Sequence, residues 1–159
     1  MNENDIMITI TGGNLMPVID NYSYHLGAAD CFCEMVAAGV KKIALSHPCD
    51  SKELRDSFLE DFDKLCAKYN VKYYLENEPF LTVLFPESMN WGKFNVIFYC
   101  EDRYLEEYLS LKKQKKEFID SGNYTDSNKK ALACAYGKLL SYSNEGIQRL
   151  LNKNTEINK

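Results

Sequence analysis

Residues 37–55 constrain the fold more than any other stretch of this chain. A helix end near Gly39 is followed by a short apolar run at residues 42–46, a polar turn at residues 46–51 and the start of another helix. This order of features is typical of an α/β protein, in which ligands gather where strands end and helices begin. We therefore look for a binding site at this turn.

The chain of 159 residues is expected to form a single domain, with a sheet-containing part at residues 1–100 and a helical part at residues 101–154. Hydrophobic residues make up 45% of the sequence and charged residues 26%, so we expect an ordinary globular core. The chain has no apolar run of about 20 residues, which argues against membrane insertion. Because the first residues are acidic and polar, we expect no signal peptide and a cytoplasmic location.

The apolar pattern predicts an α/β fold with mixed α+β character, built on a single mixed sheet. The five short strands are expected at residues 6–10, 42–46, 71–76, 80–85 and 94–100. The first two would be parallel, and the last three would form an antiparallel meander because their connections are too short for a crossover helix. Two crossover helices are expected at residues 23–38 and 51–69, and three C-terminal helices at residues 102–119, 127–140 and 144–153.

Two polar turns follow the first two predicted strands and would meet at one edge of the sheet if those strands are parallel. A helix N-terminus at such an edge offers unpaired amides and the positive end of a dipole, which suit a phosphate or a carboxylate. The predicted function is therefore binding of a small anionic ligand, and whether the chain is also an enzyme stays open. The predicted ligand-binding residues are Thr11, Gly12, Gly13, Asn14, Ser46, His47, Cys49, Asp50 and Ser51.

Cys49 and Arg55 are separated by five residues and lie between a predicted strand and a predicted helix. This spacing resembles the signature of cysteine-dependent phosphatases, in which a low-pKa thiolate attacks a phosphate that loop amides and the arginine hold. The alternative is an ordinary helix start, in which Asp50 or Ser51 caps the helix and Leu54 lies on its buried face.

Residues 137–152 carry a second pattern, in which a small residue precedes spaced basic, apolar and capping residues. The pattern resembles the helix-turn-helix of bacterial repressors, with matches or near matches at Lys138, Leu140, Ser143, Ile147, Arg149, Leu151 and Asn152. Ser141 stands where that family has a turn glycine. The resemblance implies that Ser143 caps a recognition helix in the major groove. The residues it assigns to DNA are Lys138, Ser143, Asn144, Gln148 and Arg149, with Glu145 on the same side.

Charge is unevenly divided along the chain. Residues 1–109 contain 9 Lys and Arg against 18 Asp and Glu, whereas residues 110–159 contain 10 against 5. The basic surplus agrees with DNA binding, since phosphate contacts dominate the affinity of such proteins, and it agrees equally with basic helices packed beside an acidic body. A protein-interaction module without a small ligand, or a homo-oligomer, also stays open, because 11 Tyr, 8 Phe and 1 Trp suit an interface.

The six cysteines include no Cys-x-x-Cys pair, and neither histidine lies at ligand spacing from them. We therefore predict free, reduced cysteines and no metal site. The acidic residues around Glu101 and Asp102 are interpreted as helix-start residues that the helix dipole favours. The sequence identifies no cofactor.

Overall fold

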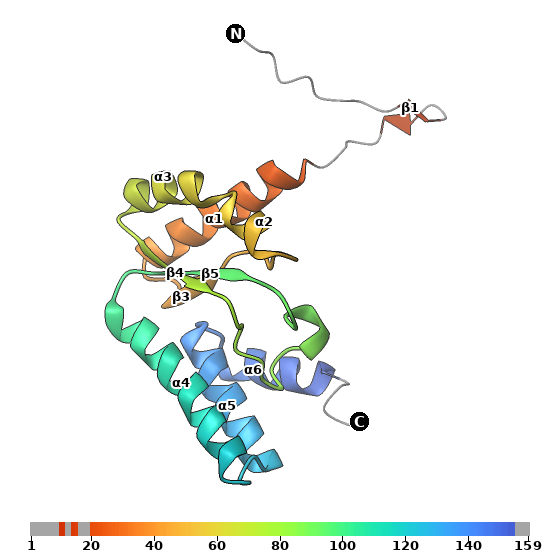
Figure 1. Ribbon diagram of the computed structural model, residues 1–159, viewed down its shortest axis with the longest axis vertical. Helices are drawn as coiled ribbons and strands as arrows, with labels where there is room; N and C mark the ends of the chain where they lie inside the picture. The colour runs from red at the N-terminus through yellow and green to blue at the C-terminus, as the bar shows by residue number, and fades with distance from the viewer. Residues whose placement is uncertain (1–9, 12–13, 16–19, 155–159) are drawn as a thin grey trace.

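The centre of the molecule is a three-stranded antiparallel sheet in the order β3-β5-β4, with helices on both faces (Figure 1). The computed structural model describes residues 10–11, 14–15 and 20–154 of the chain. Within them, β3 spans Ile43–Leu45, β4 spans Lys72–Glu76 and β5 spans Asn95–Tyr99. β5 is buried along its whole length, which agrees with the apolar sequence that follows Asn95, because a strand covered on both faces carries few polar residues.

β3 and β4 both run antiparallel to β5 and are therefore parallel to each other. The chain passes from β3 to β4 through α2 (Lys52–Asp56) and α3 (Leu59–Tyr69), so the predicted crossover exists, with β5 inserted between its two strands. Such an arrangement is a split βαβ unit. α1 (Asn21–Ala37) and α3 cover one face of the sheet, where they pack on Ala44, Val96 and Phe98.

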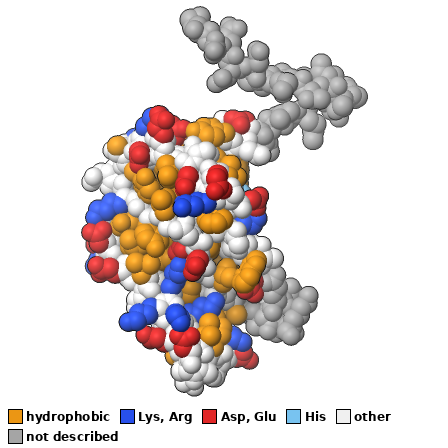
Figure 2. Space-filling model, in the orientation of Figure 1, with side chains coloured by type: hydrophobic (Ala, Val, Ile, Leu, Met, Phe, Trp, Pro, Cys, Tyr) orange, Lys and Arg blue, Asp and Glu red, His pale blue; other side chains and the backbone are white. Residues whose placement is uncertain are grey.

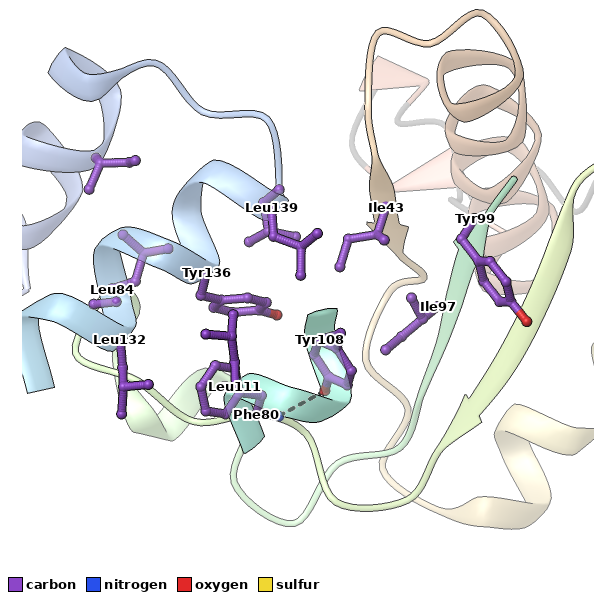
Figure 3. Packing of buried hydrophobic residues seen from close by; sticks show 13 residues of the cluster. Ile43, Phe80, Leu84, Ile97, Tyr99, Tyr108, Leu111, Leu132, Tyr136 and Leu139 are labelled. Atoms are coloured by element: carbon purple, nitrogen blue, oxygen red, sulfur yellow. Dashed lines mark hydrogen bonds between the residues drawn. The ribbon is translucent and has the colours of Figure 1, made fainter. Parts of the chain in front are cut away.

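The opposite face of the sheet is covered by α4 (Asp102–Asp120), α5 (Asp126–Leu139) and α6 (Asn144–Lys153). Ile43 and Ile97 of the sheet face Tyr108 of α4 and Tyr136 of α5 in this half of the core (Figure 3). The three predicted C-terminal helices are confirmed. They could be predicted because the sequence there carries both the apolar periodicity and the capping residues of a helix.

The prediction of five strands in a mixed sheet is wrong. Ile10–Thr11 (β1) and Asn14–Leu15 (β2) pair with each other in a separate two-stranded sheet, and residues 6–9 lie outside the described part of the chain. Residues 80–85 are irregular rather than a strand. Phe80 and Leu84 are buried in this segment, and the Phe80 amide donates to the Tyr108 hydroxyl at 3.2 Å instead of to a neighbouring strand. An apolar run can therefore fill the core without joining the sheet.

The predicted helix at residues 51–69 is interrupted, since α2 ends at Asp56 and α3 begins at Leu59. The predicted buried face is also wrong at its start, because Leu54 is exposed and Arg55 is fully buried. The Arg55 guanidinium donates to Asp56 Oδ1 at 2.7 and 2.9 Å and to Asn77 Oδ1 at 2.8 Å. These partners make the burial of a cation tolerable.

Candidate functional site

The polar turn at residues 46–51 follows β3 as predicted, but most of its polar groups bind other parts of the protein. Ser46 Oγ accepts a hydrogen bond from the Val96 amide at 2.9 Å, and Ser51 Oγ caps α2 by accepting one from the Leu54 amide at 3.1 Å. Asp50 is exposed and forms an ion pair with Lys93. A capped helix of five residues preceded by a carboxylate does not favour an anion at this turn.

The second predicted turn does not belong to the same sheet. Thr11 and Asn14 pair within the β1–β2 hairpin, while Gly12 and Gly13 lie outside the described residues. In the described residues, the two turns therefore do not follow neighbouring parallel strands, which is the arrangement that would have brought them together at one edge of the sheet. Binding of a small anionic ligand by these two turns stays a prediction.

Cys49 and Arg55 do not form the arrangement that the phosphatase resemblance implies. Cys49 is 3% exposed, and its thiol donates to the His47 carbonyl oxygen at 3.7 Å. Burial raises the pKa of the Cys49 thiol and so disfavours the thiolate that would act as the nucleophile. The Arg55 guanidinium is held by Asp56 and Asn77 and is not free to bind a phosphate.

We expect iodoacetamide to alkylate Cys31 faster than Cys49 in the folded protein, on the order of tenfold or more, because the reagent reaches a buried thiol only when the region opens. All six cysteines are free, with Cys31 exposed on α1 and Cys49 buried. Peptide mapping after a short labelling pulse measures both rates, and Cys31→Ser should remove the fast phase. Fast alkylation of Cys49 in folded protein would return the phosphatase hypothesis to consideration.

The two histidines lie side by side although α1 and the turn after β3 are distant in the sequence. The His25 and His47 ring centroids are 4.7 Å apart, and His25 stacks on Phe58 at 4.9 Å. Burial, with a smaller contribution from His47, lowers the pKa of His25. No group of three His, Cys, Asp or Glu side chains in the described residues could hold a metal ion. The contact between the His25 and His47 rings packs the turn after β3 against α1.

α5 and α6 pack closely against each other across a short turn at residues 140–143. Ser141 adopts a left-handed backbone with φ of 66°, at the position where the repressor pattern has glycine. Ser143 caps α6 as predicted, with Oγ accepting from the Gly146 amide at 3.0 Å. Gly137 lies so close to α6 that a Cβ atom there would be 2.6 Å from Ile147 Cγ1. The small residue of the pattern thus permits direct contact of the two helices.

The side chains that the resemblance assigns to DNA, Lys138, Ser143, Asn144, Gln148 and Arg149, are all exposed. α6 buries Ile147 against α5 and leaves its opposite face to solvent. Within the described part of the chain, the exposed cations that form no ion pair are Lys52, Lys130, Lys138, Arg149 and Lys153. All but Lys52 lie on α5 or α6, so uncompensated positive charge gathers on these two helices.

A cavity of about 290 Å³, partly open to solvent, lies at the outer edge of β3 and is lined by residues of α1, of the segment at residues 85–90 and of the end of α5. Ser46 lines it, together with Lys41, Asn95 and Tyr136. Lys41, Asn95 and Tyr136 were not predicted as site residues from the sequence. Only Asn95 gave a local signal, as the polar residue that opens the apolar run of β5.

No protein-family model, curated protein or solved structure matches this chain. No helix among the described residues is long and apolar enough to cross a membrane. The fold therefore places the chain in the mixed α+β class, with helices on both faces of a three-stranded antiparallel sheet.

Proposed function

We propose that this protein binds duplex DNA through α5 and α6, with α6 entering the major groove. The observation that carries the proposal is the close contact of Gly137 with Ile147 across a turn in which Ser141 is left-handed. A tight turn and a close helix contact hold a second helix at the angle at which its N-terminal residues can reach base edges.

The exposed face of α6 carries side chains suited to reading base edges. The amides of Asn144 and Gln148 can pair bidentately with adenine, and the guanidinium of Arg149 can pair with guanine. The Glu145 carboxylate can accept a hydrogen bond from the cytosine amino group. An acidic residue on this face therefore supports selective rather than purely electrostatic binding.

Affinity for the phosphate backbone would come from Lys130 and Lys138 on α5 and from Arg149 and Lys153 on α6. These side chains are exposed and bind no carboxylate in the described residues, so binding phosphate would not break an existing ion pair. Acidic and basic side chains are interspersed on the face shown in Figure 2, so the proposal depends on these particular cations and not on a broad basic surface. Each phosphate neutralised should steepen the dependence of affinity on salt by about 0.9 in the logarithmic slope.

The test is fluorescence anisotropy with a labelled random-sequence duplex of about two helical turns, at about 50 mM and about 200 mM salt. Wild-type protein should bind with an affinity that falls steeply with salt. The double variant Lys138→Ala with Arg149→Ala should bind about tenfold or more weakly, with a salt slope reduced by about 2. Thermal melting checks that the variant is folded.

Lys52→Ala is the matched control, because Lys52 is an exposed, unpaired lysine on α2, outside the helix-turn-helix. Its affinity and salt slope should equal those of the wild type. The proposal fails if wild-type protein does not bind duplex at the lower salt concentration, or if the double variant and Lys52→Ala lose the same affinity.

A further inference from the structure

We propose that the cavity at the outer edge of β3 binds a small carboxylate that has an apolar body and an N–H or O–H donor. Lys41 would bind the carboxylate, and Asn95 Oδ1 would accept from the donor. This site is separate from the exposed face of α6, and its test needs no DNA. Three features support the proposal: the apolar cavity walls, one buried acceptor without a donor and one partly buried cation.

The cavity has the size and lining of a small-ligand site. Its volume of about 290 Å³ is at the lower end of such pockets, which measure roughly 300–1,000 Å³. Apolar walls come from Phe32 of α1, from Phe85 and Met89, and from Leu140 at the end of α5. A body the size of one aromatic ring or one branched aliphatic chain would displace water from these walls.

Asn95 supplies a buried acceptor without a donor. The residue is 1% exposed, and its Nδ2 donates to the Ser46 carbonyl oxygen at 3.1 Å. Since a carbonyl oxygen can only accept, this bond fixes the orientation of the amide and leaves Oδ1 as the free atom. Asn95 Oδ1 is the one buried side-chain nitrogen or oxygen of the described residues without a hydrogen-bond partner. Because Oδ1 is buried, an N–H or O–H group of a ligand would reach it after a small movement of the amide and would then satisfy it.

Lys41 supplies a partly buried cation with neutral partners. Its Nζ donates to the Leu140 carbonyl oxygen at 3.1 Å and lies 5.4 Å from the centre of the Tyr142 ring. Burial lowers the pKa of Lys41 because it removes water from the cation. No carboxylate among the described residues lines the cavity. A carboxylate ligand would form a charge-assisted hydrogen bond in a region of low dielectric.

A second cavity, of about 300 Å³, lies between α4, α5 and the segment at residues 81–87 and differs from the cavity at β3 in the charges that line it. Lys115 and Lys129 line it, but so do Glu87 and Asp126, and Lys129 is already paired with Asp126. Positive and negative side chains balance in this second cavity, and it is therefore not expected to prefer an anionic ligand. The cavity at β3 carries positive charge alone.

The proposal is tested by titrating isotope-labelled protein with para-hydroxybenzoate and recording proton–nitrogen correlation spectra. The shifts should saturate and centre on Ala44, Leu45 and Leu140, and para-hydroxybenzamide, which lacks the charge, should bind about tenfold more weakly. Lys41→Met should weaken benzoate binding by about tenfold, whereas Lys41→Arg should retain it. Lys42→Met is the matched control, because Lys42 lies over the Tyr104 ring and does not line the cavity.

Asn95→Asp gives a second, independent variant, since it places a negative charge beside the site without changing its size and should also weaken benzoate binding. The spectrum of each variant verifies its fold. The proposal is overturned if neither para-hydroxybenzoate nor the branched α-hydroxyisocaproate gives saturable shifts around the cavity. It is also overturned if Lys41→Met binds as tightly as Lys42→Met.

Discussion

Replacing Glu76 with alanine is expected to lower the free energy of unfolding by about 3–5 kcal/mol, because the change breaks a buried ion pair on one side only. Glu76 ends β4 and is 2% exposed. Its carboxylate accepts from the Tyr108 hydroxyl at 2.7 Å and from Lys112 Nζ at 2.8 and 2.9 Å. Alanine would leave both partners of α4 without this acceptor. Urea denaturation at constant temperature measures the loss.

Glu78→Ala is the control for removal of a carboxylate from the same segment, because the Glu78 side chain is exposed. Its effect should stay within about 0.5 kcal/mol. Lys112→Met should also destabilise the protein, since it leaves the Glu76 carboxylate buried with one fewer charged donor. If Glu76→Ala lowers the free energy of unfolding no more than Glu78→Ala does, the hydrogen bonds of Glu76 with Tyr108 and Lys112 do not stabilise the packing of α4 on the sheet.

The contacts of Glu76 with Tyr108 and Lys112 show why only part of the fold could be predicted from the sequence. Glu76 ends the strand predicted at residues 71–76, and Tyr108 lies in the helix predicted at residues 102–119; both elements are confirmed. The hydrogen bond between them joins residues 32 positions apart and leaves no trace in local periodicity. Arg55 is a parallel case, since its burial depends on Asn77 and opposes the helical pattern around Leu54.

Helix ends were more predictable, because a cap is an interaction between residues a few positions apart. Ser51 and Ser143 accept hydrogen bonds from amides three residues later, and Asn70 ends α3 in a left-handed conformation with φ of 54°. For the same reason the two helices that meet within residues 137–152 and the Ser143 cap between them could be predicted, since the end of one helix and the start of the next lie within 16 consecutive residues. The apolar run at residues 80–85 had no such local signal to separate a strand from an irregular core segment.

The cavity at β3 could not be predicted, because its chemistry depends on residues from separate elements. Lys41 precedes β3, Asn95 begins β5 and Tyr136 belongs to α5, and each looks ordinary in its own segment. The cavity lies at the outer edge of β3, where the predicted strand at residues 6–10 would have been a parallel neighbour.

Replacing Gly137 with alanine is expected to lower the free energy of unfolding by about 1–3 kcal/mol, because it adds a methyl group to a filled contact. The new Cβ would lie 2.6 Å from Ile147 Cγ1, 2.9 Å from Ile147 Cδ1 and 3.4 Å from Leu84 Cδ2. Ile147 and Leu84 are both buried in a close-packed core, so the new methyl group would force their side chains to shift against other buried residues. Urea denaturation measures the loss, and duplex binding should weaken in parallel if this contact sets the position of α6.

Gly27→Ala is the matched control, because Gly27 lies within α1 and a Cβ there would meet nothing within 4 Å. Alanine is favoured over glycine in a helix, so this variant should gain about 0.5–1 kcal/mol of stability. Since both substitutions carry the same intrinsic helical gain, the difference between them isolates the contact with Ile147. Equal gains at both positions would show that Ile147 moves aside freely, and the close approach of α5 and α6 could then no longer support the DNA-binding proposal.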